Sequence, residues 1–186
     1  MKLEKATLGG FELPSKGWHA FEVTDRVALT EDGSGAATST LGVFCNVIES
    51  EEEGRSAAMF CDLSQPGGRT ALARLLYFLK MTDGIEKETG AGGDLSEAEW
   101  GDKFLDITKP KCEKLINGVI MKIPGKVFKG RIDHRPGKGK DRDGNTVERT
   151  YANFVELDFF GGDGKKAGAK KSESKAETAK EDSDEW

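Results

Sequence analysis

Residues 126–160 constrain the fold of this chain more than any other stretch. In its first ten residues Val, Phe and Ile are spaced among cations, and from Thr146 onward β-branched and aromatic residues predominate. Both patterns are typical of β-strands, because such side chains pack well on a pleated surface. Asp143 and Gly144 lie between them and favour a tight turn, since Gly readily adopts positive φ and Asp tolerates it. The stretch therefore predicts a long β-hairpin.

Three more strands are predicted earlier in the chain. Residues 18–29, 38–49 and 55–63 place apolar side chains at alternate positions, as a strand with one buried face does. Helical spacing then takes over from residue 66, and its apolar stripe consists of Leu72, Leu75, Leu76 and Leu79. Gly84 is the expected stop of this helix, and residues 85–93 are expected to form a loop.

Two shorter helices are expected before the hairpin. Ser96 and Glu99 fit a capping box at the start of a helix over residues 94–104. Residues 110–117 form a second short helix or a turn. The order of elements is therefore three strands, a helical region and two strands.

This order predicts a mainly β fold: a five-stranded OB-fold-like Greek-key barrel, with a helix between strands three and four and an extended hairpin between strands four and five. A β-sandwich-like α+β domain is the alternative. Residues 1–160 are enough for one domain with a sizeable core. Residues 161–186 consist almost entirely of Gly, Lys, Ala, Ser, Glu and Asp. They cannot bury enough apolar surface to offset the entropy lost on ordering, so we expect a disordered linker and tail.

Positive charge is concentrated in one part of an acidic chain. The net charge is −5, yet residues 109–149 hold twelve Lys and Arg against five Asp and Glu. Residues 1–108 hold ten against nineteen. A solvated hairpin does not require such concentration, whereas a polyanionic ligand favours it. The charge pattern therefore points to a nucleic-acid backbone as the ligand.

Strand alternation indicates which side chains would meet that ligand. The richer aliphatic parity should face the core, which leaves the rings of Trp18, Phe44, Phe60 and Phe154 on the outer face and sends Tyr151 inward. Exposed rings stack on bases while cations follow the phosphates, and single-strand binders combine the two. The candidate DNA-binding residues are Lys126, Lys129, Arg131, Arg135, Lys138, Lys140, Arg142, Arg149, Trp18, Phe44, Phe60 and Phe154. For each ring, burial in the core is the competing interpretation, because parity shifts at bulges and an N-terminal arm or helix could cover this face.

The end of the chain combines acids with one large ring. Its candidate partner-binding residues are Glu181, Asp182, Asp184, Glu185 and Trp186. A solubilising tail gains nothing from a Trp, whereas an apolar partner pocket with a basic rim would hold both the ring and the acids. The same residues could instead fold back on the protein's own cationic groove, or have no binding role.

These features resemble the bacterial and bacteriophage single-stranded-DNA-binding proteins. That family has an OB-fold core, a low-complexity linker and a short acidic tail with a terminal aromatic residue. Residues 161–186 look like that linker and tail, with a Trp where Phe is usual. Gly54, Arg55 and Phe60, followed by the Leu-rich helix, are similar in layout to phage members. The resemblance implies a protein that coats exposed DNA during replication or recombination and recruits other such proteins through its tail.

Other classes have little support in the sequence. The sequence contains no apolar run of about 20 residues, as a membrane span needs, and no signal-peptide pattern. Its three cysteines, an odd number, argue against the disulfide framework of a secreted protein. We therefore expect a cytoplasmic protein, in the host cytoplasm if it is phage-encoded. The His and Cys residues lack metal-ligand spacing, and there is no nucleophile motif, so we expect no metal, no cofactor and no enzymatic activity. A homo-oligomer is compatible with the sequence.

The function predicted is sequence-tolerant binding and protection of single-stranded DNA. A protein-interaction adaptor and a general RNA or nucleic-acid-binding module are the alternatives.

Overall fold

A five-stranded antiparallel sheet dominates the protein, which we describe from a computed structural model covering residues 7–8, 11–90, 94–140 and 143–161. The strand order is β5-β4-β3-β6-β7. The strands are β3 (Gly17–Glu31), β4 (Ala37–Val47), β5 (Ser56–Asp62), β6 (Val127–Lys140) and β7 (Thr146–Phe159). Two short strands, β1 (Thr7–Leu8) and β2 (Phe11–Glu12), pair separately. The predicted mainly β architecture is confirmed, but no ladder joins β5 to β7 in the described chain, so the sheet is not closed into a barrel.

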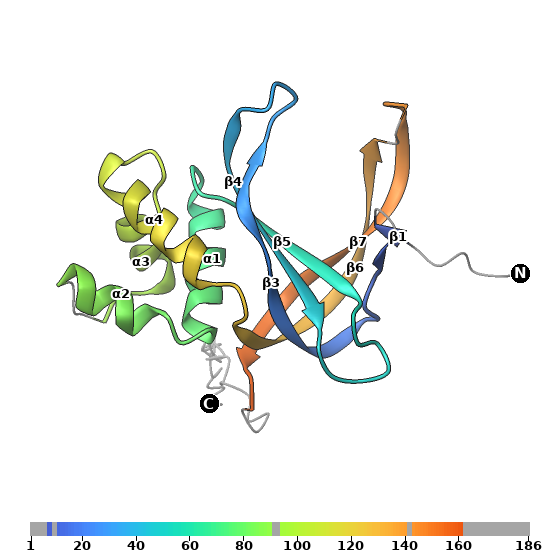
Figure 1. Ribbon diagram of the computed structural model, residues 1–186, viewed down its shortest axis with the longest axis horizontal. Coiled ribbons are helices and arrows are strands. Elements are labelled where there is room, and N and C mark those ends of the chain that lie inside the picture. The colour runs from blue at the N-terminus through green and yellow to red at the C-terminus, as the bar shows by residue number, and fades with distance from the viewer. Residues whose placement is uncertain (1–6, 9–10, 91–93, 141–142, 162–186) are drawn as a thin grey trace, which may run out of the picture.

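The four helices of the described chain all lie between β5 and β6 in sequence and on one side of the sheet in space (Figure 1). They are α1 (Pro66–Phe78), α2 (Thr82–Thr89), α3 (Glu97–Phe104) and α4 (Pro110–Lys122). Pro occupies the first turn of α1 and of α4, where its missing N–H costs no helical hydrogen bond. Ser96 and Glu99 form the predicted capping box of α3.

The expected loop over residues 85–93 was partly wrong, because α2 occupies its first half. Gly84 lies inside α2, and the break after α1 instead places Lys80 at φ 57°. The helix stop is Gly90, which adopts φ 67°. Tertiary contacts explain why a short polar segment is helical: Ile85 is buried, and the Trp100 indole donates a 3.1 Å hydrogen bond to Glu86.

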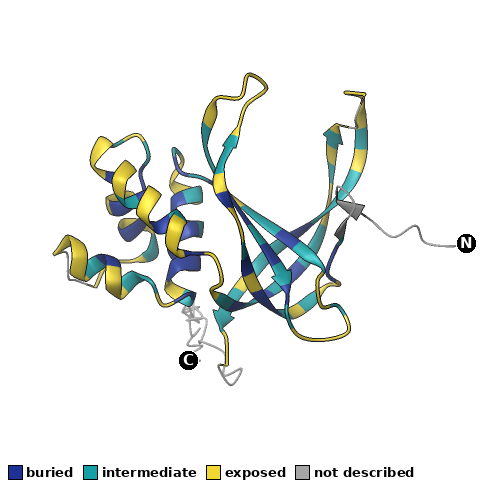
Figure 2. Cartoon of the chain, in the orientation of Figure 1, coloured by how far each residue is buried: buried dark blue, intermediate teal, exposed yellow. Residues whose placement is uncertain are grey.

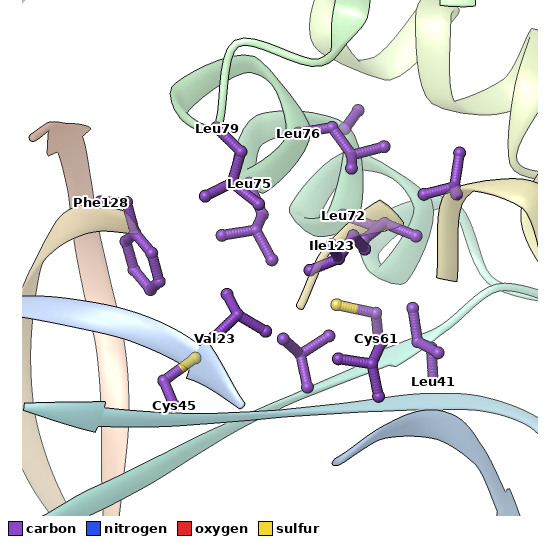
Figure 3. Packing of buried hydrophobic residues seen from close by; sticks show 14 of the residues in the cluster. Val23, Leu41, Cys45, Cys61, Leu72, Leu75, Leu76, Leu79, Ile123 and Phe128 are labelled. Atoms are coloured by element: carbon purple, nitrogen blue, oxygen red, sulfur yellow. The ribbon is translucent and has the colours of Figure 1, made fainter. Parts of the chain in front are cut away.

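The hydrophobic core lies between α1 and the sheet. Leu72, Leu75 and Leu76 are fully buried, and Leu72 and Leu75 lie between α1 and the sheet residues Val23 and Cys61 (Figure 3). Burying one such side chain stabilises the fold by about 1.5–3 kcal/mol relative to leaving it exposed. Buried residues gather on α1 and the adjoining sheet, whereas the tips of the β3–β4 and β6–β7 hairpins are exposed (Figure 2).

The N-terminal segment closes another part of the core. Leu13 is buried in the core cluster, and the carbonyl of Pro14 lies 2.7 Å from the His134 ring nitrogen Nε2. The Ser15 amide donates a 2.8 Å hydrogen bond to Glu52. Burial would raise the pKa of the Glu52 carboxyl, but the hydrogen bonds from Ser15 and the nearby charges of Arg55 and His19 outweigh it and lower the pKa. An ionised Glu52 therefore anchors this arm on the core side of the sheet.

A bulge in β7 reverses the side-chain pattern expected for that strand. Arg131 pairs with Glu156 but Ile132 pairs with Phe154, so Val155 is an extra residue in the ladder. Phe154 therefore faces inward, with its ring centroid 4.9 Å from that of the fully buried Phe21. The prediction that Phe154 lies on the outer face was wrong, and so was the inward placement of Tyr151, which pairs with the outward-facing Arg135.

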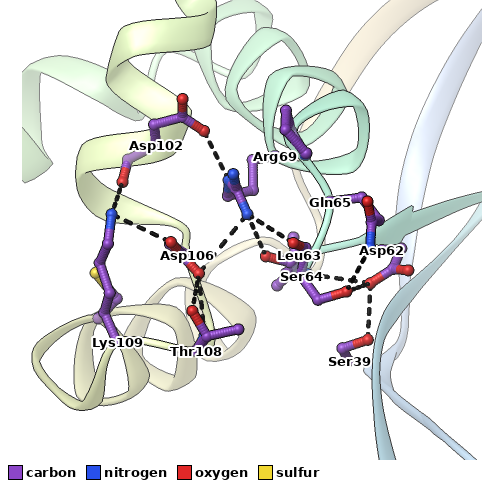
Figure 4. A network of polar contacts seen from close by, with 12 residues as sticks. Ser39, Asp62, Leu63, Ser64, Gln65, Arg69, Asp102, Asp106, Thr108 and Lys109 are labelled. Carbon is purple, nitrogen blue, oxygen red and sulfur yellow. Dashed lines mark hydrogen bonds and ion pairs between the residues drawn. The ribbon is translucent and has the colours of Figure 1, made fainter.

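A buried polar network ties the helices to the sheet (Figure 4). Arg69 of α1 is 8% exposed, and its guanidinium donates to Asp102 of α3 at 2.8 Å and to the carbonyls of Leu63 and Ser64. The same guanidinium lies 3.7 Å from Asp106. The turn after β5, helix α1 and the end of α3 are thereby held around one cation.

Candidate nucleic-acid interface

Two aromatic rings and a guanidinium contact one another on the outer face, the side of the sheet turned away from the core, and we call the three the Phe60–Phe44–Arg26 platform. Phe60 of β5 is 57% exposed, and its ring meets the edge of Phe44 on β4 at 5.9 Å between centroids. The Arg26 guanidinium of β3 lies 4.3 Å from the centroid of the Phe44 ring. The exposed Phe60 ring offers a π surface on which a base can stack, and the guanidinium stacked on Phe44 can also pair with a phosphate.

An irregularity in β3 accompanies the placement of Arg26 over Phe44. The register between β3 and β4 shifts between Val23 and Val27. The Thr24 hydroxyl donates to the Phe44 carbonyl at 3.0 Å and accepts from the Arg26 amide at 3.2 Å. Sequence reasoning missed Arg26. Arg26 lies eight residues after Trp18, so strand alternation places both side chains on the same face, and this parity was the signal that could have identified it.

Trp18 brings a second exposed ring of the outer face next to the basic strand β6. It is 48% exposed and pairs directly with Arg131, while Ala20 pairs with Lys129. Thr24 lies beside Phe44 and six residues after Trp18 along β3. The Trp18 and Phe44 rings are therefore roughly 20 Å apart along the strand direction. The rings are therefore spread over a length that suits several nucleotides rather than one base.

Carboxylates share the outer face with the cations. The Arg131 guanidinium pairs with Glu156 at 2.6 Å, and Lys16 pairs with Asp133 at 2.9 Å. The hydrogen bond from Lys16 lowers the pKa of the Asp133 carboxyl, so the carboxyl stays ionised at neutral pH. Both pairs are partly exposed, and water and salt screen such pairs strongly, so a phosphate can replace either acid at low cost.

The β6–β7 hairpin carries cations on both sides. Arg135 is exposed on the outer face, opposite Tyr151, and the Arg149 guanidinium donates to the Lys140 carbonyl at 2.8 Å. Lys138 and Lys140 have the opposite parity and point to the other side of this projecting ribbon, where both are exposed.

The predicted set is thus only partly brought together. Trp18, Phe44, Phe60, Lys129, Arg131 and Arg135 share the outer face. Lys126 lies apart from them, in a cleft between α2 and α4, and Phe154 is partly buried and packs against the core. Arg142 and the five predicted tail residues lie outside the described residues.

The described residues offer little for other chemistry. They contain no cluster of three or more His, Cys, Asp or Glu residues suited to a metal ion. Cys45, Cys61 and Cys112 are free and buried, and burial raises the pKa of the Cys61 thiol to about 12, so it stays protonated at neutral pH. None of the helices in this part of the chain has the length and apolar character needed to span a bilayer.

Comparison with known proteins adds no family to this geometry. Neither the search of protein-family models nor that of curated proteins found a match to the chain.

Proposed function

We propose that this protein binds single-stranded DNA with little sequence preference, along the outer face of the sheet. The observation that carries the proposal is the Phe60–Phe44–Arg26 platform, whose Phe60 ring is 57% exposed among the residues that the structure describes. Trp18 extends the stacking surface toward the cations of β6. Rings beside cations bind an unpaired strand, because its bases are free to stack and its phosphates follow the charge.

The strand order supports an OB-fold relationship as part of this proposal. In OB-folds the face of the second and third strands, together with the loops joining strands one to two and four to five, binds oligonucleotides. Here those strands correspond to β4 and β5, which carry Phe44 and Phe60. The two loops correspond to the tips of the β3–β4 and β6–β7 hairpins (Figure 1). The edge strands β5 and β7 also approach each other, as in a partly open barrel.

Coating of exposed DNA in replication or recombination follows from such sequence-tolerant binding. We include recruitment of partner proteins by the acidic residues 181–186 in the proposal, on the basis of their four carboxylates and Trp186. Binding and recruitment need no catalytic step.

A competition experiment tests the DNA-binding proposal. Labelled oligo-dT bound to the full chain is displaced by unlabelled single-stranded DNA, single-stranded RNA or duplex DNA at low and moderate salt. We expect single-stranded DNA to compete best and the affinity to fall as salt rises, because released counterions drive phosphate binding.

Ring variants localise the site. Phe60→Ala should weaken oligo-dT binding by about 5- to 150-fold, the equivalent of about 1–3 kcal/mol for one stacked base. Tyr77→Ala, which removes a 49% exposed ring on α1, is the matched control and should leave the affinity unchanged. Equal binding of duplex, or equal effects of the two substitutions, would contradict the proposal. Preference for RNA would support the RNA-binding alternative, and no binding at all the adaptor.

A further inference from the structure

A second cationic surface lies on the helical side of the protein. A cleft of about 710 Å³ opens between α2 and α4. Its apolar lining consists of Met81, Ile85, Leu115 and Val119. Its cations are Lys80, Lys111, Lys114, Lys122 and Lys126, all but the last on the helices or the turn between α1 and α2.

The charge balance of the cleft is unusual for this chain. Five lysines face one carboxylate, Glu88, which lies 3.9 Å from Lys122, although the whole chain carries a net charge of −5. Like charges gathered around an apolar concavity repel one another and focus a positive potential into it. Such a cleft suits a ligand that presents several carboxylates around one apolar group.

The chain itself contains a segment of that chemistry. Residues 181–186 hold four carboxylates and the indole of Trp186. An apolar floor with a basic rim matches this combination, since the ring loses water on the floor while the acids meet the lysines.

The path of the chain places this segment within reach. The Phe159 ring at the end of β7 packs on Tyr77 and Phe78, and the Lys80 ammonium lies 5.8 Å from its centroid. Lys80 also lines the cleft, so the described chain ends beside it. Nineteen residues separate 161 from 181, enough to reach roughly 25 Å, which keeps the acidic segment at a high effective concentration near the cleft.

We infer that residues 181–186 bind in cis to the α2–α4 cleft, with Trp186 on the apolar lining and the carboxylates on the lysines. This inference goes beyond the proposed function and does not depend on it. The cleft lies apart from the outer face, so the segment can stay bound while the sheet holds DNA. A partner that captures the same residues must first displace them from the lysines.

Zero-length carbodiimide cross-linking of the full chain tests the inference, because it joins a carboxylate to a lysine only when the two are in contact. We expect bonds from residues 181–185 to Lys122 and Lys126 within single chains, found by peptide mapping of the monomer band. They should disappear in Lys111→Gln/Lys114→Gln, which keeps both target lysines, and at high salt, which screens the attraction. Lys138→Gln/Lys140→Gln is the matched control and should retain them.

Three results would overturn the inference: cross-links concentrated on the hairpin lysines, cross-links that join two copies in a dimer band, or cross-links spread evenly over exposed lysines.

Fluorine NMR of the full chain labelled with 5-fluorotryptophan tests tail binding separately from DNA binding. Trp186→Phe identifies the Trp186 signal, which should move in Lys111→Gln/Lys114→Gln and stay in place when oligo-dT is added. The Trp18 signal should respond to oligo-dT alone, so either proposal can fail without the other. Movement of the Trp186 signal on DNA addition would place the segment on the outer face and overturn the inference.

Discussion

At the scale of single residues, two phenylalanines on the two edge strands of the sheet, β5 and β7, have opposite surroundings. Phe60 is mostly exposed and touches the edge of Phe44. Phe154 packs on Phe21 and Phe128, and its ring lies across Gly130, where an added Cβ would come within 2.7 Å of it. Phe154 thus supports the fold from inside, while Phe60 is free to meet a ligand.

This difference predicts opposite phenotypes. Phe154→Ala should lower the free energy of unfolding by about 2–4 kcal/mol, because it leaves a void beside two buried rings. Phe60→Ala should change it by less than about 1 kcal/mol, since the ring buries little surface in the folded state. Urea denaturation followed by circular dichroism measures both, with oligo-dT affinity measured in parallel. A stability loss for Phe60→Ala as large as that for Phe154→Ala would mean that Phe60 is a packing residue.

At the scale of elements, the β6–β7 hairpin depends on more than its ladder, because a long two-stranded ribbon is marginally stable alone. The Tyr151 ring lies over Gly137, where a Cβ would come within 2.8 Å of it, and its hydroxyl donates to the Lys138 carbonyl at 3.2 Å. These contacts hold the ribbon together beyond the sheet. They also fix which cations share the face with Trp18.

The two sides of the hairpin should differ in their contribution to DNA binding. In a plot of log affinity against log salt, Lys129→Gln/Arg135→Gln on the outer face should reduce the slope by about 0.7 for each phosphate that the variant no longer neutralises. Lys138→Gln/Lys140→Gln on the opposite side should reduce it less, and Lys87→Gln on α2 not at all. Fluorescence titrations at four salt concentrations give these slopes. If the Lys138/Lys140 pair had the larger effect, the strand would run along the other side of the ribbon.

At the scale of the whole molecule, the Arg69 network joins the helical layer to the sheet. The Thr108 hydroxyl donates to Asp106 at 2.6 Å, and Lys109 pairs with it at 3.1 Å. The hydrogen bond from Thr108 is the main cause that lowers the pKa of Asp106 from 3.8 to about 2, with the Lys109 ammonium adding to it. A carboxyl whose pKa is lower in the folded state stabilises the fold above its unfolded pKa, and this stabilisation is lost as pH falls toward the folded value.

Asp106→Asn should therefore reduce the free energy of unfolding by about 1–3 kcal/mol at pH 7, the range for hydrogen bonds to charged groups. The difference between the native chain and the variant should shrink as pH falls from about 4 to 2, where Asp106 itself becomes protonated. Urea denaturation at pH 7 and pH 3 measures it. Asp94→Asn, at an exposed carboxyl, is the control. An equal difference at both pH values would show that the charge of Asp106 is not what stabilises the network.

The sequence alone determined the strands, most of the helices and the concentration of cations in residues 109–149. Period-two alternation, the apolar stripe of α1 and the capping box of Ser96 and Glu99 are local properties, so each can be read without knowing what packs nearby. Only the tertiary structure decided the bulge at Val155, the helix at α2, the position of Lys126 beside α4 and the open edges of the sheet. Each of these depends on contacts between segments far apart in the chain. A one-residue shift in register moves every following side chain to the opposite face of the sheet. The alternation within a single strand does not indicate where such a shift occurs.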